Sequence, residues 1–94
     1  MCYEVEMINR ESDEKECTET YEVYVQTVNE DRTTQYNNTG WYVEDKSVRG
    51  EDGTLSLVAT RIYHTDGREL PIDGGIISGI DNLHAFLNSN LPVV

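Results

Sequence analysis

Cysteine is scarce in this sequence, and long apolar runs are absent. Cys2 and Cys17 are the two cysteines among 94 residues, too few for the disulfide framework that stabilises many small secreted domains. No stretch approaches the ~20 apolar residues of a membrane-spanning helix. Residues 1–10 lack the basic and apolar regions of a signal peptide. We therefore expect a cytoplasmic protein with no membrane partner.

Motifs for metal binding, phosphate binding and catalysis are also missing. Neither histidine, His64 or His84, has a cysteine or a second histidine at the spacing of a metal site. Gly74, Gly75 and Gly79 precede a predicted helix, but the P-loop and dinucleotide-binding fingerprints are absent. We expect no enzymatic activity, no cofactor and no metal.

Basic residues are few. Seven lysines and arginines stand against 18 aspartates and glutamates, which gives a formal net charge of −11 at pH 7. Direct binding to DNA, RNA or an anionic membrane would meet repulsion over most of the surface. The charge instead favours a protein partner with a basic surface, such as a component of a nucleic-acid-binding complex.

Two alternating runs near the N-terminus predict an antiparallel β-hairpin over residues 1–28. Apolar or aromatic residues occupy every second position of both runs and polar residues lie between them, which is typical of half-buried strands. These apolar and aromatic positions are Tyr3, Val5, Met7, Tyr21, Val23 and Val25. The polar segment 10–16 is expected to connect the two strands.

Further strands are predicted in the middle of the chain. The polar stretch 29–40 predicts a loop, with or without a short strand near residues 33–36. Residues 41–72 predict additional antiparallel strands, with Asp66 and Gly67 forming a hairpin turn.

One short helix is predicted over residues 78–90. Ile80, Leu83 and Leu87 follow one another at helical spacing, and Ser78 is placed to cap the first turn. The fold class is therefore α+β. We expect a single domain over residues 1–94, with a four- to five-stranded antiparallel β-meander and the helix packed on one face.

The negative charge is concentrated in the predicted hairpin. The first 31 residues hold ten acidic and two basic residues, whereas the rest of the chain holds eight and five. If Val5 faces Val23, then Glu6 lies directly opposite Glu22, and like charges in that arrangement are destabilising. A chain that needed charge for solubility alone could avoid this cost, so we interpret the negative face as one that binds something.

These features favour a protein-binding module, and in particular an inhibitor that presents an acidic sheet face to a basic, nucleic-acid-handling protein. Complementary charge speeds association and orients the partners, and exposed tyrosines are frequent anchors in interfaces. Tyr36 is a second exposed aromatic candidate, whereas Trp41 is expected in the core. The predicted partner-binding residues are Glu4, Glu6, Glu11, Asp13, Glu14, Glu19, Glu22 and Tyr24.

In size, charge and lack of a catalytic motif, the chain is similar to small acidic inhibitors encoded by phages, such as DNA mimics and anti-CRISPR proteins. It shares no motif with a particular family of them. If it is encoded by a phage, its compartment is the cytoplasm of the host cell.

Two other functions remain open on the sequence. Acidity can simply keep a small domain soluble, and the chain would then be a structural or assembly subunit. Such a subunit could form a homodimer through a sheet edge or through the apolar tail 91–94. The third alternative is a small enzyme that uses His64 with an acidic residue.

Overall fold

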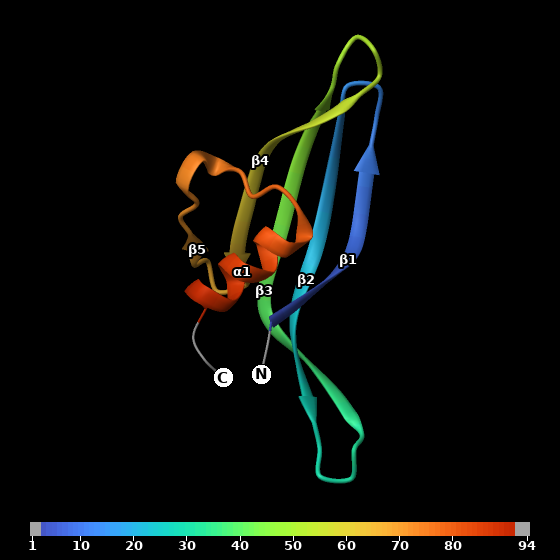
Figure 1. The fold of residues 1–94 in the computed structure, drawn as a ribbon. Coiled ribbons are helices and arrows are strands. Elements are labelled where there is room, and N and C mark those ends of the chain that lie inside the picture. Colours follow the sequence, from blue (N-terminus) through green and yellow to red (C-terminus); the bar gives the residue numbers. More distant parts are fainter. Residues whose placement is uncertain (1–2, 92–94) are drawn as a thin grey trace.

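The computed structural model describes residues 3–91, which form one antiparallel sheet and one α-helix (Figure 1). Neighbouring strands in the sequence are neighbours in the sheet, in the order β1-β2-β3-β4-β5. The predicted α+β meander is therefore confirmed. The elements in chain order are β1 (Tyr3–Ser12), β2 (Glu16–Val28), β3 (Thr34–Arg49), β4 (Leu55–His64), β5 (Glu69–Leu70), the 3-10 turn η1 (Asp73–Gly75) and α1 (Ile80–Asn90).

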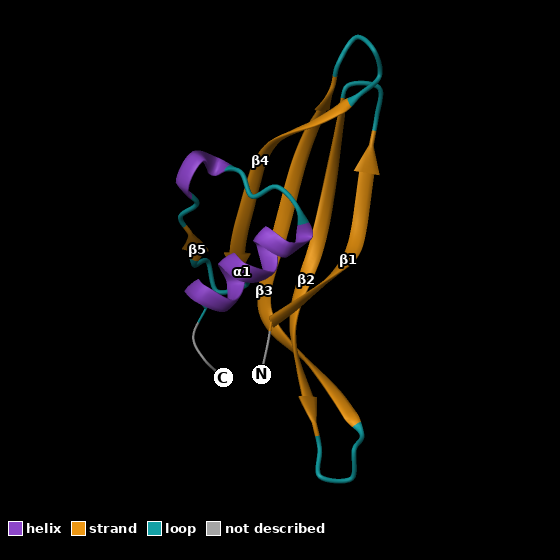
Figure 2. Cartoon of the chain, in the orientation of Figure 1, coloured by secondary structure: helices purple, strands orange, loops and turns teal. Residues whose placement is uncertain are grey.

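Helix α1 packs on one face of the sheet and builds the core with it (Figure 2). Leu83 and Leu87 of the helix are buried together with Val23, Val43 and Ile62 of the three central strands. Each such side chain contributes roughly 1.5–3 kcal/mol on burial. A helix of 11 residues is too short to persist alone in water, so this packing is what holds it in place.

The two faces of the sheet differ in what covers them. We call the side that carries α1 the helix face and the opposite side the open face. Because side chains alternate along a strand, the burial of Val23 and Val43 under the helix directs Glu22, Tyr24 and Tyr42 to the open face. Within residues 3–91, no helix or strand covers that side (Figure 1).

Strands β2 and β3 extend beyond the other strands as a two-stranded arm (Figure 1). The last described pair of β1 with β2 joins Tyr3 to Val25, and the last pair of β4 with β3 joins His64 to Trp41. We call residues 26–40 the arm: residues 26–28 pair across its turn with residues 34–36, and Asn37 and Asn38 pair with Val25 and Tyr24 at its base. Of the segment 29–40, predicted as a loop with or without a short strand near 33–36, only residues 29–33 are a turn, and the rest belongs to β3. The turn itself is short, and it is closed by a hydrogen bond of 2.8 Å from the Asn29 backbone N–H to the Thr33 carbonyl.

Gly40 allows β3 to leave the main sheet and continue into the arm. Its φ is +83°, a conformation that side chains other than hydrogen disfavour. The His64 ring lies over this glycine, with its Nε2 3.2 Å from the Thr39 carbonyl oxygen. A β-bulge occurs at the same level: the pairing passes from Glu22–Tyr42 to Tyr24–Asn38.

The helix begins differently from the prediction. Gly79 is the N-cap residue, with φ of +90°, and no side chain caps the first turn. The expected Ser78 cap is therefore wrong. Instead the Ser78 backbone carbonyl accepts a hydrogen bond of 2.7 Å from the Asn82 side chain. The hydroxyl of Ser78 does not cap the helix.

Gly40→Ala is expected to lower the free energy of unfolding more than Gly53→Ala. Both glycines have φ of +83°, so alanine meets the same backbone cost of about 1–2 kcal/mol at either position. At Gly40 the new Cβ would also lie 2.6 Å from Nε2 of His64, whereas at Gly53 it would meet nothing within 4 Å.

Urea denaturation of the two variants measures the difference. The clash should cost about 1 kcal/mol or more beyond the backbone term. Equal losses for Gly40→Ala and Gly53→Ala would show that the His64 ring does not constrain the junction with the arm.

Candidate functional site

Four of the predicted partner-binding residues meet on β1 and β2. The register has Val5 opposite Val23, so Glu6 lies opposite Glu22 and Glu4 lies opposite Tyr24. This is the pairing assumed for the two strands from the sequence. Cβ atoms of directly opposed residues are about 4.5–5.5 Å apart. The two carboxylates of Glu6 and Glu22 therefore share one small area of the open face.

A hollow of about 450 Å³ lies on the open face where the arm joins the sheet. Both Glu6 and Glu22 line it, together with the side chains of two tyrosines. The full lining is Val5, Glu6, Glu22, Tyr24, Tyr36 and Asn38. The volume is in the lower part of the range of ligand pockets, about 300–1,000 Å³.

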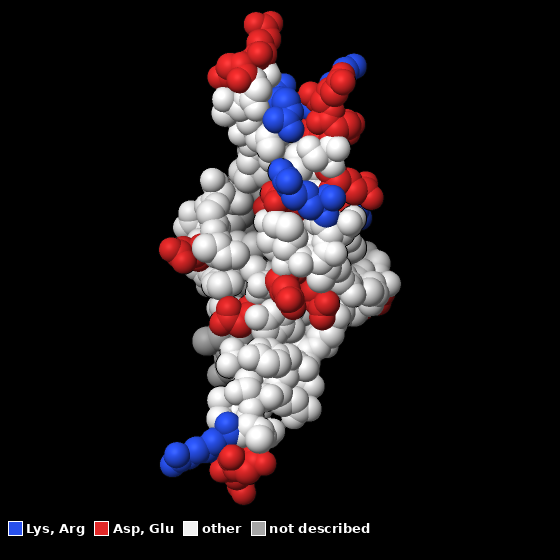
Figure 3. Space-filling view, turned by 90° about the vertical axis from the view of Figure 1, so that its right-hand side faces the viewer, with Lys and Arg blue, Asp and Glu red and all other residues white. Residues whose placement is uncertain are grey.

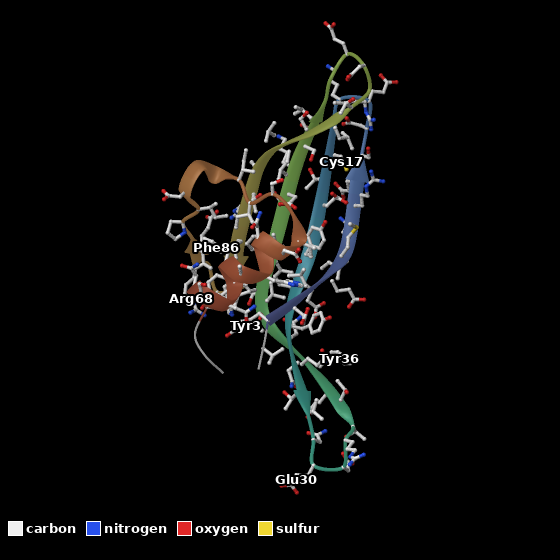
Figure 4. The ribbon with its side chains drawn as sticks, viewed as in Figure 1. Tyr3, Cys17, Glu30, Tyr36, Arg68 and Phe86 are labelled. Atoms are coloured by element: carbon white, nitrogen blue, oxygen red, sulfur yellow. The ribbon has the colours of Figure 1, made fainter. Side chains whose placement is uncertain are left out.

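The arm supplies one wall of this hollow. Tyr36 and Asn38 are arm residues, and Tyr36 lies near the point where the arm meets the sheet (Figure 4). The Tyr36 ring stands edge-to-face to the Tyr24 ring, with 5.5 Å between centroids, which is a favourable aromatic geometry. Tyr36 nevertheless remains 62% exposed, so much of its surface is free for contact.

A hydrogen bond from Asn38 connects two parts of the hollow's lining. The Asn38 side chain donates to Oε1 of Glu22 at 2.7 Å, and Asn38 Oδ1 accepts from the Gly40 backbone N–H at 2.6 Å. Asn38 thus ties the position of a carboxylate in β2 to the glycine junction of β3. One carboxylate oxygen of Glu22 is thus held in place by Asn38, and the other oxygen does not take part in this hydrogen bond.

The surroundings of Tyr24 in the hollow shift the pKa of its phenol upward. Partial burial raises the pKa of the Tyr24 phenol, and the nearby carboxylates of Glu4 and Glu6 raise it further. Glu4 sits at the margin of the group: it is half-buried, and its Oε2 lies 3.5 Å from Nε2 of His84 on α1.

The other predicted acidic residues do not join this site. Glu11, Asp13 and Glu14 lie at the far end of the β1–β2 hairpin. Asp13 serves the turn there, accepting from the backbone N–H groups of Lys15 and Glu16 at 2.7 and 2.8 Å. Those hydrogen bonds lower the pKa of its carboxyl.

Glu19 lies on the helix face, because it is two residues from Tyr21 and four from the buried Val23. There it is 3.7 Å from Arg10 and opposite Asp45 in the register.

On the face shown in Figure 3, basic side chains lie next to acidic ones in the upper part and at the lower tip. Lys46 lies 3.3 Å from Glu16, and Arg49 donates its backbone N–H to the Lys15 carbonyl, so bases accompany the acids at the hairpin end. The predicted acidic residues thus form a local group around the hollow and a separate, mixed-charge group at the hairpin end. They do not form one continuous acidic face.

Asn38 is not among the residues that the sequence predicts for the site, and Tyr36 is only a secondary candidate there. Asn38 falls in the predicted loop, where residues two apart have no fixed relation, and Tyr36 at the end of the short strand that the sequence leaves open near residues 33–36. Tyr36, Asn38 and Tyr42 share one parity of positions, and a period of two across a polar segment is the signal that could have grouped them.

His64 has structural contacts at both ring nitrogens. Nε2 faces the Thr39 carbonyl, and Nδ1 lies 3.1 Å from the Asp66 backbone nitrogen. The ring also packs edge-on against Trp41, with centroids 5.1 Å apart. Trp41 is buried in the core as expected. The arrangement fixes the turn after β4 and the Gly40 junction.

Residues 3–91 contain no group of three or more His, Cys, Asp or Glu side chains that could hold a metal ion. Of the helices in that range, none has the length and apolarity to span a bilayer. Cys17 is a buried free thiol, and Cys2 lies outside the described residues.

Comparison with known proteins gave no match to a family model, a curated protein or a solved structure.

Glu6→Gln is expected to raise the free energy of unfolding by about 0.2–1 kcal/mol, because it removes the repulsion between Glu6 and the directly opposed Glu22. Glu11→Gln is the matched control: it removes the same charge from the same strand, but Glu11 faces Thr18. Urea unfolding at low salt compares the two. A gain of equal size in both variants would mean that net charge, and not the opposed pair, sets the cost.

Asp45→Asn is expected to stabilise the protein at pH 7. Burial raises the pKa of the Asp45 carboxyl, a hydrogen bond from the Thr60 hydroxyl partly opposes this, and Glu19 adds to the rise. One carboxylate oxygen of Asp45 is buried without a hydrogen-bond partner. An acid whose pKa is raised by folding favours its protonated form in the fold, so the ionised form costs stability above that pKa.

The advantage of Asp45→Asn should therefore shrink as pH falls through the raised pKa, and vanish below the ordinary carboxyl value of 3.8. Glu51→Gln, in the exposed turn after β3, controls for the loss of one negative charge. Urea unfolding from pH 7 to pH 3.5 checks the trend. An advantage that is constant with pH would contradict it.

Proposed function

We propose that this chain is a protein-binding module that docks the open face of its sheet on a basic surface of a partner protein. The observation that carries the proposal is the opposed pair Glu6 and Glu22 beside Tyr24 and Tyr36 in one hollow. Like charges placed opposite each other weaken a sheet. Exposed tyrosines are frequent hot-spot residues in protein interfaces, and here one lies next to the carboxylate pair.

The charge supports a partner that handles nucleic acid. Surfaces that bind DNA or RNA are rich in lysine and arginine because they neutralise phosphates. A chain with net charge −11 is attracted to such a surface and repelled by the nucleic acid itself. By occupying the surface, it would act as an inhibitor in the host cytoplasm, as a phage-encoded counter-defence protein does.

The distribution of charge favours local docking over imitation of a whole duplex. A DNA mimic needs long rows of carboxylates in place of phosphates. Here Lys15, Lys46 and Arg49 lie among the acids of the hairpin end, and the opposed pair Glu6 and Glu22 lies farther along β1 and β2.

Self-assembly through the sheet edge is the second candidate. Strand β1 is an edge strand, and Met7 and Ile8 on it are 44% and 50% exposed. However, the bulge between Met7 and Asn9 is a device that protects an edge from further pairing. Of the apolar tail 91–94, Leu91 is buried in the protein's own core, and residues 92–94 lie outside the described part.

The proposal predicts a partner whose binding depends on Glu6 and Glu22. The immobilised chain is exposed to host lysate, and retained proteins are identified and then purified for titration. Glu6→Lys with Glu22→Lys should weaken binding of the true partner by about tenfold or more. Glu11→Lys with Glu14→Lys changes the net charge equally at the far hairpin end and should have a much smaller effect.

Binding should also weaken steeply when salt rises from about 50 to about 300 mM, because screening shortens the reach of the charges. The purified partner should lose affinity for nucleic acid when the wild-type chain is present. The proposal fails if no retained protein distinguishes the two double variants. It also fails if the chain forms a stable oligomer and binds nothing else.

A further inference from the structure

We propose that the hollow between the arm and the open face receives the guanidinium group of an arginine side chain from the partner. This inference rests on the proposed function and names the group that the site recognises. It is carried by the chemistry of the lining and by two contacts that the chain makes within itself.

The hollow has two carboxylates and no basic group of its own. Glu6 and Glu22 line it, and none of its six lining residues is basic. The arginines that make ion pairs within the described residues make them elsewhere. These pairs are Arg10 with Glu19, Arg61 with Glu69, and Arg68 with Asp66. The negative charge of the hollow is therefore available to a cation from outside.

The chain twice places a guanidinium on an aromatic ring next to a carboxylate. Arg61 lies 4.7 Å from the centre of the Tyr63 ring and bonds Glu69 at 2.8 Å. Arg68 lies 5.1 Å from the centre of the Trp41 ring and bonds Asp66 at 2.7 Å; it is labelled in Figure 4. The hollow offers the same two groups, ring and carboxylate, without an arginine.

Geometry favours arginine over lysine as the occupant. A guanidinium is planar, donates five hydrogen bonds in a fixed fork and stacks on aromatic rings. Because Glu6 and Glu22 are directly opposed and line the hollow together with the exposed Tyr36, a guanidinium that enters it is offered both a carboxylate pair and an aromatic ring. A lysine ammonium is a compact, strongly hydrated charge that gains less from stacking and from a fork of acceptors.

Rigidity of the site supports the same conclusion. Asn38 holds one oxygen of Glu22 at 2.7 Å, and Tyr24 holds the Tyr36 ring edge-to-face. Groups fixed before binding lose less conformational freedom when the ligand arrives. The acceptor and the ring are thus in place in the free protein.

The test titrates the ¹⁵N-labelled full chain with three short peptides that differ at one central residue. The residue is arginine, lysine or citrulline, which keeps the shape of arginine without its charge, and the flanking residues are glycine and serine. The arginine peptide should shift the amide signals of Tyr24, Tyr36 and Asn38. It should bind at least about threefold more tightly than the lysine peptide, and the citrulline peptide should not bind measurably.

Variants of Tyr36 separate ring contact from charge. Tyr36→Leu should weaken arginine binding about fivefold or more and remove the preference over lysine, whereas Tyr36→Phe should retain both. Glu22→Gln should weaken both cationic peptides, and Glu14→Gln, at the distant hairpin end, should weaken neither. Dispersion of the amide spectrum reports whether each variant is folded.

The inference is overturned if lysine and arginine peptides bind equally, if Tyr36→Leu has no effect, or if the shifts map outside the hollow. Each of these results leaves the proposed function intact whenever partner binding still depends on Glu6 and Glu22. Conversely, arginine recognition in the hollow would stand even if no lysate partner were found.

Discussion

The structure depends on one-sided burial of a sheet under a single short helix. Leu83 and Leu87 close the core over Val23, Val43 and Ile62, and within residues 3–91 no second layer covers the opposite side. An antiparallel sheet tolerates this arrangement because its second face can be polar. The open face is therefore stabilised by contacts between its own side chains, such as the stacked rings of Tyr42 and Tyr63, and it is free to meet another molecule.

The arm follows from the way β3 crosses the edge of this core. Beyond the last described pairs of β2 with β1 and of β3 with β4, β2 and β3 continue without a helix beneath them (Figure 1). Gly40 provides the left-handed residue at that point, and the His64 ring occupies the space that a side chain would need. The same junction brings Tyr36 and Asn38 beside Glu22. A structural constraint on the backbone thus also shapes the candidate site.

Charge acts locally in this protein. The net charge of −11 favours basic partners in general. Several of the acidic side chains, however, already accept hydrogen bonds in turns or form ion pairs, as Asp13 and Glu19 do. The distinctive feature is a pair of carboxylates held opposite each other, next to rings. Two arginines of the chain lie over rings beside carboxylates, which is the combination of groups that the hollow also offers.

The sequence by itself determined the strand and helix pattern and the faces of the first hairpin. Alternation of apolar and acidic residues from Tyr3 to Val25 was enough to predict which side chains share a face, because that signal is local and has a period of two. That Val5 pairs with Val23, and Glu6 therefore with Glu22, was an assumption on the sequence that the structure bears out. Only the tertiary structure decided the rest. The arm at 26–40 carries no apolar alternation of its own, and its pairing depends on the bulge and on Gly40. The grouping of Tyr36 with Glu6 joins residues that are distant in the chain, and only the path of β3 across the sheet brings them together.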